Sequence, residues 1–139
     1  MTKNDEGAPV IEIGENKGGL RNGSYSSYFK DDAPIIPVGT EWVRFKTEVR
    51  KESYTYLYAF DDGDWIETGI TLDAAVLSDD YVVREYGGFF TGAYVGLAAV
   101  DYSGYDSTAE FDFFDYKELG DYLEADGSFS WRAAETRYF

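Results

Sequence analysis

Residues 42–72 carry the pattern that most constrains the fold of this chain. From 43 to 50, apolar or uncharged side chains alternate with charged ones, and from 54 to 60 every second residue is aromatic. Asp61-Asp62-Gly63-Asp64 contains an Asp-Gly pair typical of hairpin turns, where aspartate serves backbone geometry, and residues 65–72 supply a return strand. Period-two alternation with one charged face indicates half-buried antiparallel strands. We therefore predict a three-stranded meander.

A second stretch, residues 87–101, opens with paired glycines and paired phenylalanines and continues without charge until Asp101. Its apolar part, residues 93–100, is typical of a central strand that is buried on both faces. Gly92 and Gly96 disfavour a helix, because each glycine costs about 1 kcal/mol in a helix interior. We expect the glycine-aromatic lead-in, residues 87–92, to be the functional part of this stretch.

The remaining segments are short and separated by turn residues. Residues 1–8 are polar and predicted to be disordered, and residues 119–139 form a C-terminal extension, either an extra hairpin or a loose tail. Between them, residues 9–118 form the predicted domain. Short strands with turns between them and almost no helix indicate an all-β fold, an antiparallel β-sandwich.

Within that domain, five further local features are predicted. These are a strand at 9–13, a loop at 14–28 with one short strand near Tyr25–Phe29, an edge segment at 34–38, a helical turn at 74–77 that Ser78-Asp79-Asp80 ends, and an aromatic strand at 110–116.

Composition excludes several classes of function. The chain has 139 residues and a net charge of −15, which disfavours nucleic acid and anionic membranes as partners. That charge is typical either of a solvated acidic surface or of adaptation to high salt. The chain has no cysteine and no histidine, so thiol chemistry, histidine-ligated zinc and serine–histidine catalysis are absent. It carries no signal-peptide core and no run of 18 apolar residues, so we expect a cytoplasmic protein.

Five motifs, in this order, carry a family resemblance. They are Glu48-Val49, Tyr58-Ala59-Phe60-Asp61-Asp62-Gly63-Asp64-Trp65, Leu72 to Tyr81, Gly88-Phe89-Phe90-Thr91-Gly92-Ala93-Tyr94-Val95-Gly96, and Ala109-Glu110-Phe111-Asp112-Phe113-Phe114. Together they resemble the C-terminal concanavalin A-like β-sandwich, a jelly roll, of family 43 β-xylosidases and α-L-arabinofuranosidases. The resemblance covers roughly residues 10–118 and is partial at its N-terminal side.

The resemblance implies that the chain is not an enzyme by itself, because the family's catalytic carboxylates lie in a five-bladed propeller that this sequence lacks. It implies a non-catalytic ancillary domain that packs on such a propeller and shapes its substrate pocket. The chain is then a fragment, a split gene product or a stand-alone sandwich reduced in strand number. Missing strands would leave an open sheet edge, where the chain could associate with itself.

In the family, a phenylalanine from the glycine-flanked loop reaches the propeller's pocket, and the motif places that role on Phe89 or Phe90. The alternative for either residue is packing within the sandwich.

Two other functions remain open. Tyr54, Tyr56, Tyr58 and Trp65 would serve as sugar-stacking residues of a free-standing carbohydrate-binding module for xylo- or arabino-oligosaccharides, although an aromatic core is the commoner arrangement. A truncated remnant without function is the third reading.

Asp101 and Asp106 offer calcium-type oxygen ligands without the spacing of an EF-hand. A solvated turn is the better reading of this loop, and we expect neither a metal nor another cofactor.

Overall fold

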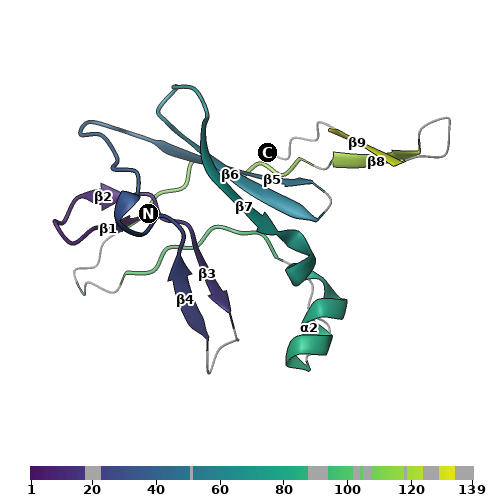
Figure 1. Ribbon diagram of the computed structural model, residues 1–139. Helices are drawn as coiled ribbons and strands as arrows, with labels where there is room; N and C mark the ends of the chain where they lie inside the picture. Colours follow the sequence, from purple (N-terminus) through teal and green to yellow (C-terminus); the bar gives the residue numbers. More distant parts are fainter. Residues whose placement is uncertain are drawn as a thin grey trace. The chain divides into compact units, whose positions relative to one another are not determined.

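A computed structural model describes residues 1–17, 23–50, 52–87, 94–101, 104, 108–117, 119–123 and 129–133. The chain divides into two compact units, Met1–Ala93 and Tyr94–Phe139, and each is described by itself. The described residues are mostly β, with four small antiparallel sheets (Figure 1).

The predicted meander is confirmed as the largest of these sheets. Strands β5 (Val43–Arg50), β6 (Ser53–Phe60) and β7 (Ile66–Asp73) lie in the order β5-β6-β7. All neighbours are antiparallel, and β5 pairs with β6 in an unbroken register from Val43 opposite Phe60 to Arg50 opposite Ser53. The β6–β7 register shifts between Thr55 and Leu57. Gly69, at φ +72°, lies on β7 within that bulge, where a left-handed residue is required.

The two faces of β5 are not buried as the alternation predicts. On the apolar face, Phe45 and Val49 are 55% and 50% exposed. On the charged face, Arg44, Lys46 and Glu48 are half-buried. The expectation that the apolar face is the covered one is therefore wrong for β5. The reason is local, because ion pairs and a tryptophan ring cover the charged face, as described below.

A small core forms where the N-terminal segment meets the sheet. Strands β1 (Thr2–Lys3) and β2 (Pro9–Val10) pair with each other, although the polar composition of residues 1–8 did not predict a strand there. The predicted edge segment contributes a single bridge, from Ile35 to Val10. Val10, Ile11, Tyr58 and Ala59 are the buried hydrophobic residues among those described. The division into domains itself stays a prediction.

The loop predicted at residues 14–28 contains two strands rather than one. Strands β3 (Gly14–Lys17) and β4 (Ser24–Ser27) pair antiparallel, with Gly14 opposite Ser27. A 3₁₀ turn, η1 (Lys30–Asp32), follows them. The strand near residue 25 is confirmed, and its partner is an addition that the glycine-rich and polar composition concealed.

The helical turn predicted at residues 74–77 is confirmed as η2 (Ala74–Leu77), and it ends at Ser78 as predicted. Ser78 also begins a helix that was not predicted, α2 (Asp79–Tyr86), by accepting a hydrogen bond from the backbone N–H of Tyr81. The acidic residues at its first turn favour the helix N-terminus, and Gly87 at φ +70° ends it. Among the described residues, no helix has the length and apolar character needed to cross a membrane.

In the second unit, two predicted strands are absent. Residues 94–101 and 108–117 contain no strand, and their large side chains are exposed: Tyr94 is 95% exposed and Phe113 is 59% exposed. The prediction of a buried central strand over residues 93–100 is therefore wrong for its described part, and so is the strand at 110–116. Strand formation depends on a hydrogen-bonding neighbour, and neither segment is paired with a strand in the described part of the chain.

Strands β8 (Leu119–Leu123) and β9 (Phe129–Ala133) form an antiparallel hairpin in the C-terminal extension. A hairpin was one of the two arrangements predicted for this extension.

Candidate functional site

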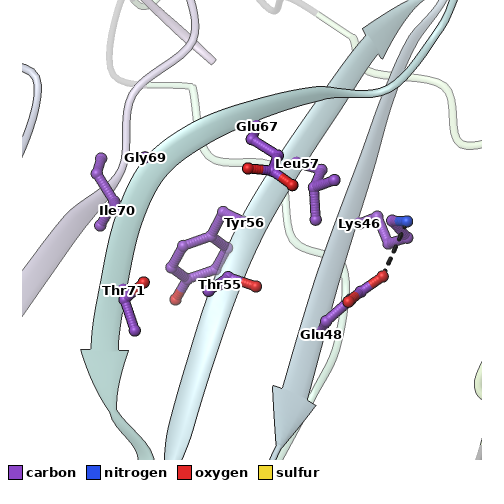
Figure 2. Close-up of a pocket in the computed structure, with 9 residues that line it drawn as sticks. All are labelled: Lys46, Glu48, Thr55, Tyr56, Leu57, Glu67, Gly69, Ile70 and Thr71. Carbon is purple, nitrogen blue, oxygen red and sulfur yellow. Dashed lines mark ion pairs between the residues drawn. The ribbon is translucent and has the colours of Figure 1, made fainter.

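A shallow pocket of about 320 Å³ lies on the charged face of the sheet, at the bulge between β6 and β7. Its lining residues come from all three strands and are Lys46, Glu48, Thr55, Tyr56, Leu57, Glu67, Gly69, Ile70 and Thr71 (Figure 2). The bulge creates room because β7 has three residues, Thr68, Gly69 and Ile70, where β6 has only Tyr56. Threonine hydroxyls and paired charges give this pocket the hydrogen-bonding groups that a polar ligand such as a sugar requires.

The charges at the pocket are paired along β5. Lys46 Nζ lies 3.0 Å from Glu48 Oε1, and an Arg50 guanidinium nitrogen lies 3.3 Å from Glu48 Oε2 (Figure 2 shows the first pair). The hydrogen bond from Lys46 is the largest cause of a lowered pKa at Glu48; Arg50 adds to it, while burial opposes it. The sequence pattern placed these residues on the charged face of a half-buried strand and did not predict that they pair with one another. Their opposite charges at a two-residue spacing were the signal for a paired cluster.

Trp65 covers the same charged face beside the pocket. Its ring centroid lies 5.0 Å from Lys46 Nζ and 5.1 Å from the Arg44 guanidinium carbon, which are cation–π distances. Arg44 also donates a 2.6 Å hydrogen bond to the carbonyl of Gly63, while its Nε is buried without a partner in the structure. Trp65 itself is 40% exposed, so part of its ring remains accessible to a ligand.

The tyrosine stripe lies on the other face of the sheet from Trp65, although Tyr56 also lines the pocket at the bulge. Tyr58 pairs with Ile66, and the alternation of side chains along β7 places the preceding Trp65 on the opposite face. Tyr54, Tyr56 and Tyr58 share one face of β6, and the rings of Tyr54 and Tyr56 meet edge to face with centroids 5.5 Å apart. The structure therefore does not bring Trp65 and the tyrosines into one stacking platform.

Two of the three tyrosines in the stripe are half-buried, and Tyr58 is only 8% exposed. Burial is the largest cause that raises the pKa of Tyr56 to about 12, and Tyr54 adds to the effect. Tyr28, the residue after β4, donates a hydrogen bond to Glu15 on β3, and this hydrogen bond is the largest cause that raises the pKa of Tyr28 to about 12. These rings resemble a small core more than an open sugar platform, and their predicted sugar-stacking role stays a prediction.

The other predicted site residues are placed only in part. Phe89, Phe90 and Asp106 lie outside the described residues. Asp101 lies in an exposed segment, and within the residues that the structure describes no three acidic side chains are grouped as metal ligands would be. The roles predicted for the two phenylalanines and for the calcium-type aspartates therefore stay predictions.

Comparison with known proteins identifies relatives of the chain. Residues 1–117 match the family described as "Beta xylosidase C-terminal Concanavalin A-like domain". A β-xylosidase from Bacillus subtilis (strain 168) is 42% identical over 84 residues, which make up 60% of this chain and 15% of that protein. A xylan 1,3-β-xylosidase from a Vibrio species is 32% identical over 118 residues, or 85% of this chain and 20% of that protein. No solved structure matches the chain.

These matches confirm the resemblance and the mostly β, concanavalin A-like class that the five motifs predicted. The chain spans at most 20% of the length of these two relatives, and the matched family is their C-terminal, non-catalytic domain. The chain therefore belongs to the family of β-xylosidase C-terminal concanavalin A-like domains.

Proposed function

We propose that this chain is a non-catalytic ancillary domain that packs on a family 43-type catalytic propeller and helps to shape its substrate pocket. The observation that carries the proposal is the family match. It covers residues 1–117 of this chain but only the C-terminal domain of proteins that are named β-xylosidases. A chain of this kind acts through a partner that supplies the catalytic carboxylates.

The exposed apolar side chains of the second unit support an interaction with another protein surface. Tyr94, Val95, Phe111 and Phe113 are all more than half exposed. Covering these side chains with another protein surface would remove apolar area from water, which favours association.

Residues 88–92, which follow α2 in the sequence, are the part of the chain that we assign to the pocket. The described structure ends just before them, at Gly87, which has φ +70° and ends α2. In the family that this loop resembles, a phenylalanine at this place shapes the substrate pocket. An aromatic face suits this role because it packs well against the apolar face of a sugar ring.

Reconstitution tests the proposal. The propeller of the Bacillus subtilis β-xylosidase, expressed without its C-terminal domain, is mixed with the full 139-residue chain, and hydrolysis of an aryl-xyloside is measured. We expect turnover to rise above that of the propeller alone. Phe89→Ala or Phe90→Ala should abolish the gain, whereas Phe45→Ala, on the sheet, should preserve it. Equal turnover with and without the chain would refute the proposal.

A free-standing carbohydrate-binding module is the second candidate, because the half-exposed Trp65 lies beside a polar pocket. It predicts retardation of the chain in gels that contain xylan or arabinan. Trp65→Ala should abolish the retardation, and Trp42→Ala is the matched control, since Trp42 is 47% exposed and lies outside the pocket lining. Unchanged mobility of the wild-type chain in every polysaccharide gel would exclude this function.

A further inference from the structure

The outer edge of β5 is open to another strand. In the described part of the chain, β5 pairs with β6 on one side and with no strand on the other. Asp61 donates its backbone N–H to the carbonyl of Trp42 at 2.9 Å, which places Trp42 in a hydrogen-bonded pair. Such pairs recur at every second residue, so Lys46 and the other even-numbered residues of β5 bond to β6. The odd-numbered residues therefore direct their N–H and C=O groups outward.

The opposite side of β6 supports this assignment. Ala74 donates its backbone N–H to the carbonyl of Glu52 at 2.8 Å, so the even-numbered residues of β6 bond to β7. The odd-numbered residues of β6 remain for β5, as the alternation requires. The residues of β5 whose backbone N–H and C=O groups point away from β6 are therefore Val43, Phe45, Thr47 and Val49. The strand contains no proline, and its register with β6 has no bulge, so it lacks two common protections of an edge.

The sequence of β5 is complementary to itself about Thr47. Consider two copies of β5 paired antiparallel and centred on this residue. Thr47 of one copy then lies opposite Thr47 of the other. Phe45 of each copy lies opposite Val49 of the other copy. Phe45 and Val49 are half exposed in the single chain and would cover each other. On the charged face, Lys46 then lies opposite Glu48 of the other copy, also twice. Centring the pair on Lys46 or Glu48 instead would oppose like charges.

We propose that β5 is a self-association surface, on which β5 of a second copy of this chain pairs antiparallel with its two-fold axis at Thr47. The outward groups of Phe45, Thr47 and Val49 then form about six backbone hydrogen bonds across the axis. This proposal goes beyond the ancillary role above and does not depend on it.

Two electrostatic repulsions oppose the association, one between arginines and one between the net charges of the two chains, and both are weakened. Arg44 of one copy faces Arg50 of the other in this register. The Arg44 guanidinium is turned away over Trp65 and held by the carbonyl of Gly63, while Arg50 is paired with Glu48 of its own chain. The net charge of −15 per chain repels at long range, and salt at about 0.15 M limits this to a Debye length of about 8 Å. An interface of one strand pair is small, so the dimer should be weak and depend on concentration.

Complementary charge variants provide the first test. In a dimer of the Glu48→Lys variant, a lysine at position 46 lies opposite a lysine at position 48 on each side of the axis. In a dimer of the Lys46→Glu variant, glutamates lie opposite each other at the same two places. In sedimentation velocity, the wild type should shift from the 15.7 kDa monomer toward twice that mass as its concentration rises. Each variant alone should associate about tenfold more weakly, and their equimolar mixture should recover wild-type association, because both cross-strand pairs are then attractive.

Cross-linking reports the register directly, since the wild-type chain has no cysteine. Directly opposite hydrogen-bonded residues have Cα atoms about 5.5 Å apart, within the range for a disulfide. Thr47→Cys should therefore form a covalent dimer under mild oxidation with diamide. Val49→Cys is the matched control on the same edge, because the two copies of residue 49 lie about 13 Å apart in this register.

Proline substitution completes the test. Thr47→Pro removes an outward N–H at the axis, and Thr71→Pro removes one from the other outer edge, on β7. We expect only Thr47→Pro to abolish the dimer. The proposal is overturned if the wild type stays monomeric at about 1 mM, if the charge variants do not complement each other, or if Val49→Cys cross-links as readily as Thr47→Cys.

Discussion

Replacing Asp61 should reveal how the turn between β6 and β7 positions the sheet. Its carboxylate oxygen Oδ1 accepts backbone N–H groups from Glu41 and Trp42, both at 2.9 Å. Its backbone has φ +47°, in the left-handed region. Asp61→Ala removes both hydrogen bonds, at about 1 kcal/mol each, and leaves an alanine in a conformation that tolerates it less well than aspartate does. The free energy of unfolding should therefore fall by about 2–3 kcal/mol.

Two further substitutions at this position separate the contribution of the hydrogen bonds from that of the backbone. Asp61→Asn keeps an accepting oxygen and a residue that tolerates the left-handed region, so it should cost less than about 1 kcal/mol. Asp61→Gly loses the hydrogen bonds but relieves the backbone, so its cost should fall between those of asparagine and alanine. Asp62→Ala, in the same turn, is the control and should change stability by less than about 0.5 kcal/mol.

Urea unfolding followed by tryptophan fluorescence measures these differences. With a slope of about 1.5 kcal/mol/M, the alanine variant should unfold about 1.3–2 M earlier than the wild type. If Asp61→Gly is as destabilising as Asp61→Ala, the left-handed backbone does not contribute as argued. If Asp61→Ala leaves the midpoint unchanged, the two side-chain hydrogen bonds do not hold the start of β5.

Three further predictions concern the helix and the titrating groups. Ser78→Ala should cost about 1 kcal/mol and reduce the helical circular dichroism signal, whereas Ser78→Asp should preserve both, because either Ser or Asp caps a helix N-terminus. The pKa of Glu48 in the folded state lies below its usual value of 4.5, so the stabilisation from this carboxylate is present above pH 4.5 and lost as the pH falls through the folded pKa. Glu48→Gln should flatten the loss of stability in acid urea titrations, and an unchanged slope would contradict this. The pKa of Tyr28 is raised to about 12, so the stabilisation of the fold by its hydrogen bond is present below pH 10 and lost between pH 10 and 12. Tyr28→Phe should remove one late-ionising tyrosine from an ultraviolet titration.

The meander could be predicted because every signal for it is local. Alternation over 43–50 and the Asp-Gly turn at 62–63 determine strand type and connection without reference to distant residues. The helix α2 was also encoded locally, since Ser78, Asp79 and Gly87 are typical cap residues. It was missed because a Ser-Asp-Asp run can either end one turn or begin a helix, and the following Tyr81–Tyr86 has no clear helical apolar stripe.

The errors at residues 94–101 and 108–117 have a different cause. Their apolar and aromatic content fits a strand, yet a strand is defined by the neighbour that accepts its hydrogen bonds. A single sequence shows the capacity of Phe111 and Phe113 to lie on a sheet face, but not which strand is beside them. The same limitation applies to Trp65. The face of the sheet on which its side chain lies depends on the length of the turn between β6 and β7 and on the register of these two strands. The alternating tyrosines of β6 do not specify either quantity.

Register also connects the turn, the pocket and the β5 edge. The bond from Asp61 to Trp42 determines which residues of β5 pair with β6, and a shift by one residue would move every side chain to the other face. In the observed register, the Lys46–Glu48 pair lines the pocket while Phe45, Thr47 and Val49 direct their backbone groups outward. Shifted by one residue, Lys46 and Glu48 would present their backbones to a second copy, and the apolar residues would face the pocket. The turn therefore determines both where a polar ligand can bind and which strand edge can associate.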